Sequence, residues 1–68
     1  MKSFSNIEKT FGNYPGWPRL KVDVDPDDYT FEASLVCAGE IIQTSGEGFN
    51  SIQAALNELD TRLEKNES

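Results

Sequence analysis

The chain has 68 residues, enough for one small domain, near the size at which a single hydrophobic core is only marginally stable. Its 12 carboxylates and 6 bases give a formal net charge of −6, which disfavours binding to the phosphate backbone of nucleic acids. With no histidine and a single cysteine, Cys37, it has no internal disulfide, no thiolate metal cluster and no imidazole base, so we predict neither an enzyme nor a metal or cofactor protein.

Residues 1–18 are predicted to be a loop-rich N-terminal segment that begins with a short helix. Phe4, Ile7 and Phe11 have the spacing of one helical face, which predicts a helix over Ser3–Phe11. The residues that follow, 12–18, hold two prolines and two glycines, and these prevent regular structure.

Two aromatic side chains, Tyr14 and Trp17, lie in this loop, each directly before a proline. Aromatic residues in such a place either pack as a lid over one end of the core or stand out as a binding arm. We expect packing, because so short a domain needs the apolar area. As a binding arm, the same pair is a candidate contact for a partner.

Residues 19–44 are predicted to form a three-stranded antiparallel sheet. Apolar and polar side chains alternate over Arg19–Asp25 and again over Tyr29–Cys37, as is typical of half-buried strands. Pro26 favours a type I turn between these two runs. Glu40–Thr44 is the third expected strand. The side chains expected to face the core are those of Leu20, Val22, Val24, Tyr29, Phe31, Ala33, Leu35 and Cys37.

A two-residue loop at Ala38 and Gly39 would fix how the second and third strands pair. Val36 would then lie opposite Ile41, Leu35 opposite Ile42, and Ser34 opposite Gln43. This register places Val36 and Ile41 together on the outer face of the sheet, where an apolar pair is a candidate surface for self-association or for a partner.

A C-terminal helix is predicted over residues 50–64, followed by a short tail at residues 65–68. Its apolar stripe consists of Phe49, Ile52, Ala55, Leu56, Leu59 and Leu63. Asn50 is the expected N-cap, with Gln53 completing a capping box. The solvent side is expected to hold Gln53, Asn57, Asp60 and Glu64. The fold class is therefore α+β, with a three-stranded antiparallel sheet packed on one helix.

Residues 23–48 hold seven carboxylates and no base, whereas residues 1–22 hold four bases and one acid. Asp23, Asp25 and Glu32 are expected on the outer face of the sheet, with Asp27 and Asp28 at the first turn. The spacing partly resembles a calcium loop, but the glycine and the distal glutamate of that motif are missing. The segment indicates either a docking face for a basic partner or a surface that only confers solubility.

The order of a hairpin, a Gly-containing turn over residues 45–48 and an Ala-rich helix at Ala54 and Ala55 resembles the C-terminal half of a double-stranded RNA-binding domain. The resemblance covers about half of the chain. That family holds phosphates with lysines at the start of its last helix, and residues 50–54 contain no base here. The resemblance therefore implies the fold without the RNA-binding function.

We expect a small non-catalytic interaction protein, such as a phage or prophage accessory protein, that binds a host protein. The partner would be a basic or nucleic-acid-handling protein, whose basic groove the carboxylates would occupy. The alternative is a homodimeric structural protein that associates through the outer sheet face or a strand edge. The candidate contacts are Asp23, Asp25, Asp27, Asp28, Glu32, Val36, Ile41, Tyr14 and Trp17.

Two further expectations follow from the basic N-terminal segment and from the apolar pattern. In principle, the basic side chains of this segment could bind nucleic acid while Tyr14 and Trp17 stack on nucleobases. The basic side chains are scattered, however, so the sequence gives this hypothesis little support.

No apolar run approaches the roughly 20 residues of a membrane span, and the first residues lack the apolar core of a signal peptide. We therefore expect a cytoplasmic location, in a bacterium or in an infected host cell.

Overall fold

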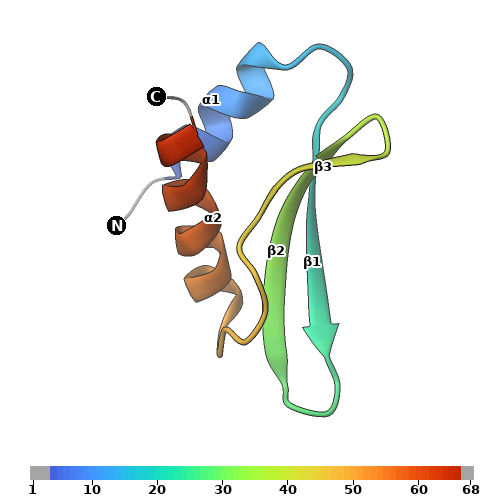
Figure 1. Ribbon diagram of the computed structural model, residues 1–68, viewed down its shortest axis with the longest axis vertical. Coiled ribbons are helices and arrows are strands. Elements are labelled where there is room, and N and C mark those ends of the chain that lie inside the picture. The colour runs from blue at the N-terminus through green and yellow to red at the C-terminus, as the bar shows by residue number, and fades with distance from the viewer. Residues whose placement is uncertain (1–3, 67–68) are drawn as a thin grey trace.

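The computed structural model describes residues 4–66 and has the α+β fold that the sequence predicts (Figure 1). A short N-terminal helix, a three-stranded antiparallel sheet and a longer C-terminal helix follow one another along the chain. The elements are α1 (Ser5–Asn13), β1 (Arg19–Asp25), β2 (Thr30–Cys37), β3 (Glu40–Thr44) and α2 (Ile52–Asn66). Neither helix within the described range has the length and apolar character needed to cross a membrane.

The strand order is β1-β2-β3, so that β1 and β3 are the two edges of the sheet. The bounds of β1 and β3 are those predicted, whereas β2 begins at Thr30 rather than at Tyr29. Tyr29 belongs to the turn: its φ is 55°, and its N–H donates to the Asp25 carbonyl at 2.8 Å. Its side chain is 77% exposed, so the prediction that it faces the core is wrong.

The second hairpin has the predicted two-residue loop, and Val36 lies opposite Ile41. Ala38 and Gly39 both have positive φ, 54° and 80°, as the tight turns of two-residue hairpins require.

A β-bulge then shifts the register of β3. Leu35 lies opposite Gln43, and Ser34 lies opposite Thr44, so the predicted pairs Leu35–Ile42 and Ser34–Gln43 are wrong. The extra residue is Ile42, which packs against the core. The bulge also brings Thr44 to the outer face, since its hydroxyl donates to Glu32 at 2.9 Å.

The core lies between α2 and the inner face of β2. Helix α2 packs on β2 and β3, and β1 lies on the far side of β2 (Figure 1). Among the described residues, the buried apolar side chains are those of Ile7, Ala33, Leu35, Ala55, Leu59 and Leu63. Phe4, Phe31, Ile42, Phe49 and Leu56 are partly buried against them.

Strand β1 is exposed along its whole length, which contradicts the prediction that its apolar side chains face the core. Leu20, Val22 and Val24 are 40%, 37% and 54% exposed. They do lie on the inner face, because each is directly opposite an inner-face residue of β2. Helix α2 packs mainly on β2 and β3, so these three side chains are covered only in part. Ile52, at the start of α2, is likewise 45% exposed instead of buried.

The N-cap of α2 is Ser51 rather than Asn50. The Ser51 hydroxyl accepts a hydrogen bond from the Ala54 N–H at 3.1 Å, which satisfies one of the free donors of the first turn. At the other end, the helix continues to Asn66, so the first half of the predicted tail is helical. Residues 67 and 68 lie outside the described residues.

Helix α1 is shifted towards the C-terminus relative to the prediction, and Ser3 lies outside the described residues. Of its expected apolar face, Ile7 is buried, whereas Phe11 is 38% exposed. The residue before the helix, Phe4, supplies no side-chain cap.

The cap of α1 comes instead from α2. The Asp60 carboxylate accepts hydrogen bonds from the backbone N–H groups of Asn6 and Ile7, both at 3.0 Å, and from the Asn6 side-chain amide at 3.1 Å. Asp60 is only 7% exposed, so its expected position on the solvent side is wrong. A carboxylate at this position also interacts favourably with the positive end of the α1 dipole.

We predict that Asp60→Ala destabilises the protein by about 1–3 kcal/mol, because the part-buried N–H of Asn6 and the buried N–H of Ile7 lose their acceptor. Asp60→Asn keeps an acceptor oxygen and should lose less. Urea unfolding followed by circular dichroism measures both variants. Glu64→Ala, an exposed carboxylate on the same helix, is the matched control and should stay within about 0.5 kcal/mol of wild type. Equal losses for Asp60→Ala and Glu64→Ala would contradict the capping role.

Candidate protein-interaction site

The carboxylates of residues 23–48 converge mainly at one end of the sheet. Asp23 lies directly opposite Glu32, so the two side chains share the outer face, as predicted. Asp27 and Asp28 are exposed at the adjoining turn. We call the following residues the acidic end: Asp23, Asp25, Asp27, Asp28, Glu32 and Glu47.

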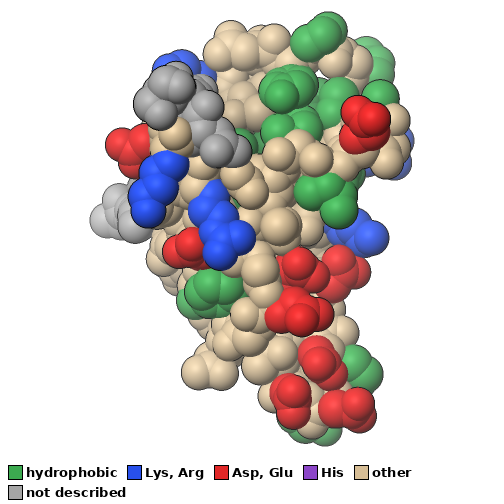
Figure 2. All heavy atoms as spheres, in the orientation of Figure 1, with side chains coloured by type: hydrophobic (Ala, Val, Ile, Leu, Met, Phe, Trp, Pro, Cys, Tyr) green, Lys and Arg blue, Asp and Glu red, His purple; other side chains and the backbone are tan. Residues whose placement is uncertain are grey.

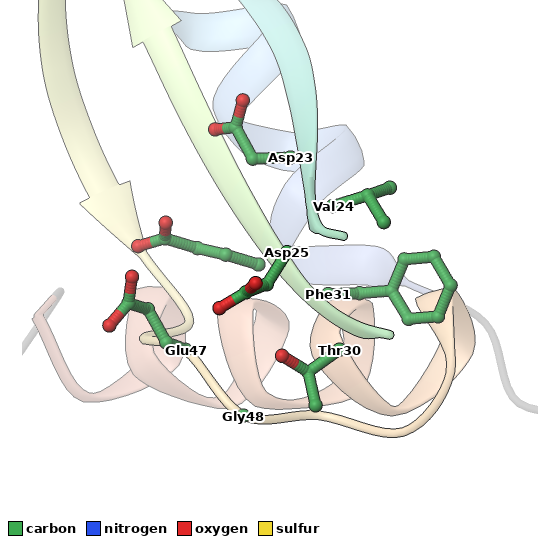
Figure 3. A pocket seen from close by; sticks show the side chains of 8 residues that line it. Asp23, Val24, Asp25, Thr30, Phe31, Glu47 and Gly48 are labelled. Carbon is green, nitrogen blue, oxygen red and sulfur yellow. The ribbon is translucent and has the colours of Figure 1, made fainter. Parts of the chain in front are cut away.

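A hollow of about 170 Å³ lies within the acidic end. Figure 3 shows Asp23, Asp25 and Glu47 extending to one side of the sheet, while Val24 and Phe31 extend to the other. The hollow is lined by Asp23, Val24, Asp25, Thr30, Phe31, Glu32, Glu47 and Gly48. The lining thus gathers carboxylates on one side of the sheet and includes no base.

Glu47 joins this site because the loop between β3 and α2 runs back beside β2. Phe31 and Phe49 exchange backbone hydrogen bonds of 2.7 and 3.4 Å, which fix the loop against the strand. Gly46 and Gly48, with φ of 83° and 95°, allow the bends on either side of Glu47. The glycines predicted a turn, but its direction depends on the distant contact with Phe31.

The Glu32 carboxylate is held in place by a chain of contacts that reaches α2. It accepts a hydrogen bond from the Thr44 hydroxyl at 2.9 Å, and that hydroxyl accepts one from the Gly46 N–H at 3.2 Å. The Thr44 carbonyl in turn accepts from the Arg62 guanidinium at 3.0 Å. Arg62 is oriented by an ion pair with Glu58 at 2.8 Å.

The Asp25 carboxylate is fixed in a different way, by the hairpin turn itself. It accepts a hydrogen bond from the backbone N–H of Asp27 at 3.0 Å, which forms an Asx turn. Asp25 therefore holds the turn that carries Asp27 and Asp28. The geometry of the acidic end is set by backbone and side-chain contacts on three separate segments of the chain.

The acidic end places like charges together with little compensation. Asp23 and Glu32 are direct cross-strand neighbours, an arrangement that destabilises a sheet. Lys21 forms an ion pair with Asp23 at 3.9 Å, but both side chains are more than half exposed, so this pair contributes little. In the part of the chain that the structure describes, no three acidic or cysteine side chains are arranged to hold a metal ion.

The apolar candidate residues lie at the opposite end of the sheet. Trp17 is 89% exposed and Tyr14 is 44% exposed, so the expectation that they pack as a lid is wrong. The backbone explains the position of the indole: Gly16 and Trp17 both have positive φ, 89° and 33°, and turn the chain outwards. Their place against the sheet is taken by the loop backbone, whose Pro15 and Gly16 carbonyls accept hydrogen bonds from the Cys37 thiol at 3.4 and 3.5 Å.

A second hollow, of about 500 Å³, marks this end. It is lined by Gly16, Trp17, Arg19, Val36, Cys37, Ala38 and Gly39. Cys37 is half-buried here, not fully buried as the sequence predicts, and Ile41, opposite Val36, is 66% exposed. Figure 2 shows the resulting division: the main cluster of acidic side chains lies towards the lower end of the molecule, and most hydrophobic side chains in this view lie towards the upper end.

The predicted contacts therefore form two groups rather than one surface. Asp23, Asp25 and Glu32 lie together, as expected, and the structure adds Glu47 to them. Trp17 lies near Val36 at the other end, while Tyr14 lines neither hollow.

Comparison with models of protein families, with curated proteins and with solved structures finds no match for this chain. The resemblance to a double-stranded RNA-binding domain therefore stays a prediction. The chemistry of the two ends of the sheet is what bears on function.

We predict that Glu32→Gln stabilises the protein by about 0.2–1 kcal/mol at low ionic strength, because it removes the repulsion from Asp23. The amide oxygen can still accept the hydrogen bond from Thr44. Urea unfolding at low and at high salt measures the effect, which should shrink as salt screens the charges. The control is Glu40→Gln on β3, which lies opposite Cys37 and should change stability little. A stabilisation as large in Glu40→Gln would contradict the cross-strand repulsion.

Proposed function

We propose that this protein is a small non-catalytic interaction module that binds a basic segment of another protein through its acidic end. The observation that carries the proposal is the hollow in which carboxylates from β1, β2 and the β3–α2 loop meet without a base. A cluster of one sign attracts charged partners over a distance and favours a complementary surface. The repulsion between Asp23 and Glu32 would be relieved by such a partner.

The lining of the hollow suits a lysine or arginine side chain in particular. The carboxylates of Asp23, Asp25 and Glu47 extend to the same side of the sheet, where together they offer acceptors for one charged head. The volume of about 170 Å³ is small, which fits one side chain rather than a folded ligand.

The charge also favours a protein partner over a nucleic acid. Phosphates would be repelled by the acidic end, and the first residues of α2, Ile52 to Ala54, carry no base that could hold them. A protein that itself handles nucleic acids has a basic groove, and the row of carboxylates is complementary to it. We include such a protein among the partners that the acidic end fits.

We predict that a lysine- and arginine-rich decapeptide binds at the acidic end. In an NMR titration, amide shifts should concentrate at residues 23–32 and 47–48, and the affinity should fall as salt rises. The triple variant Asp27→Asn, Asp28→Asn, Glu32→Gln should bind about tenfold more weakly, since three charge pairs of about 0.5 kcal/mol each are lost.

The matched control for this experiment carries the same change in net charge elsewhere. The substitutions Glu8→Gln, Glu40→Gln and Glu64→Gln alter exposed carboxylates outside the acidic end. This variant should bind the decapeptide almost as well as wild type. Equal weakening in the two triple variants would mean that net charge alone attracts the peptide, and the proposed site would be wrong.

A further inference from the structure

Strand β1 is an open edge of the sheet, and no bulge interrupts it. Charged side chains commonly discourage pairing at such an edge, but those of β1 are of both signs. The strand pairs with β2 over seven residues without a register shift, and its other side has no strand beside it within the described residues. The opposite edge, β3, is shorter and bulged. A long regular edge with apolar residues on one face is a template for pairing with another strand.

The backbone groups that β1 presents at this edge follow from the contacts of β2. Ala33 directs its N–H and C=O away from β1, to the hydroxyl and the N–H of Ser45 at 2.9 and 2.8 Å. Its cross-strand partner, Val22, is therefore in a non-hydrogen-bonded pair. Since the ladder alternates, Leu20, Val22 and Val24 all direct their N–H and C=O outwards, to the open edge.

The charges along β1 are self-complementary when the strand is reversed. Its sequence places Arg19 and Lys21 before Val22, and Asp23 and Asp25 after it, at mirrored positions. We propose that two copies of this protein pair antiparallel through β1, with Val22 opposite Val22 on a two-fold axis. Arg19 then lies opposite the second copy's Asp25, and Lys21 lies opposite the second copy's Asp23.

In this register, the residues whose backbone N–H and C=O point to the open edge form the hydrogen-bonded pairs. Val22 exchanges two N–H···O bonds with Val22 of the second copy, and Leu20 exchanges two with Val24 of the second copy. The charged residues fall in the non-hydrogen-bonded pairs, where side chains on neighbouring strands come closer. Backbone and side chains therefore favour the same register.

Other antiparallel registers fail on the backbone or on the charges. After a shift by one residue, N–H and C=O groups that point to the open edge of one strand meet residues of the other strand whose N–H and C=O point to its own β2. Centring the pair on Lys21 or on Asp23 places that residue opposite the same residue of the second copy, so that two identical charges face each other. Centring it on Leu20 or on Val24 places two bases or two acids opposite each other. The register centred on Val22 alone opposes unlike charges throughout.

The apolar face of β1 also gains from this arrangement. Leu20, Val22 and Val24, which α2 leaves partly exposed, would join the same residues of the second copy in one continuous apolar row. Such an interface is small, so we expect a dimer that dissociates on dilution. Self-association goes beyond the proposed function. In the dimer, Asp23 and Asp25 face the second copy's bases, and the carboxylates that stay available to a basic partner are those of Asp27, Asp28, Glu32 and Glu47.

Sedimentation velocity over a range of concentrations at physiological salt tests the dimer with two charge variants. In Asp23→Lys, Asp25→Lys and in Arg19→Asp, Lys21→Asp, all opposed charges become alike, so each variant alone should be monomeric. Mixed together, they oppose unlike charges again and should form a heterodimer. Both variants keep a negative formal net charge, so their overall charges do not attract each other. Circular dichroism checks that each is folded.

The results that overturn the proposal are equally defined. A wild-type protein that stays monomeric at millimolar concentration, or variants that do not pair when mixed, would refute it. Ile41→Glu should leave the dimer intact, because Ile41 lies on β3, away from the open edge of β1. Loss of the dimer in Ile41→Glu would instead assign the interface to Val36 and Ile41 on the outer face.

Cross-linking tests the register independently of charge. The substitution Cys37→Ser first removes the native thiol. In that background, Val22→Cys should form a disulfide between residue 22 of the two copies, since the opposed Cα atoms are about 5.5 Å apart. Leu20→Cys has similar exposure and lies on the same face, but its copies would be ~14 Å apart. It should not cross-link under the same oxidising conditions. Cross-linking of Leu20→Cys without Val22→Cys would refute the register.

Discussion

The width of a single helix is the constraint on which the rest of this structure depends. A helix with its side chains is about 10–12 Å across, and strands lie about 4.8 Å apart, so one helix covers about two strands. Helix α2 lies mainly on β2 and β3 and leaves the inner face of β1 partly exposed. As a result β1 belongs to the sheet but not to the core. The surfaces to which we assign binding and self-association both include this strand.

Polar contacts from α2 position the parts of the chain that the small core does not hold. Asp60 supplies the cap of α1, and Arg62 binds the Thr44 carbonyl at the end of β3. Through these two residues, helix α2 is connected both to α1 and to the end of β3. Because Thr44 in turn orients Glu32, the geometry of the acidic end depends on a residue of the helix on the other side of the sheet.

The elements of this fold could be predicted from the sequence because their signals are local. Alternation over Arg19–Asp25 and the turn residues Ala38 and Gly39 give the strands and one hairpin register directly. The coverage of each strand could not be predicted, since Leu20, Val22 and Val24 alternate just as they would in a covered strand. The part played by Asp60 could not be predicted either, because its partner Asn6 is 54 positions away. Of the candidate site, the carboxylates of the sheet were predictable, whereas Glu47 was not, since its place depends on the pairing of Phe31 with Phe49.

The outward position of Trp17 affects how this protein can be observed by spectroscopy. It is the only tryptophan of the chain, and its indole is already in contact with solvent in the folded state. Its fluorescence should therefore change little on unfolding, so a melting curve recorded by tryptophan emission would miss the transition. The same indole lines the hollow beside Val36, and any molecule that covers this end of the sheet should shift its emission and shield it from a soluble quencher. Trp17 is thus a built-in optical probe of occupancy rather than of folding.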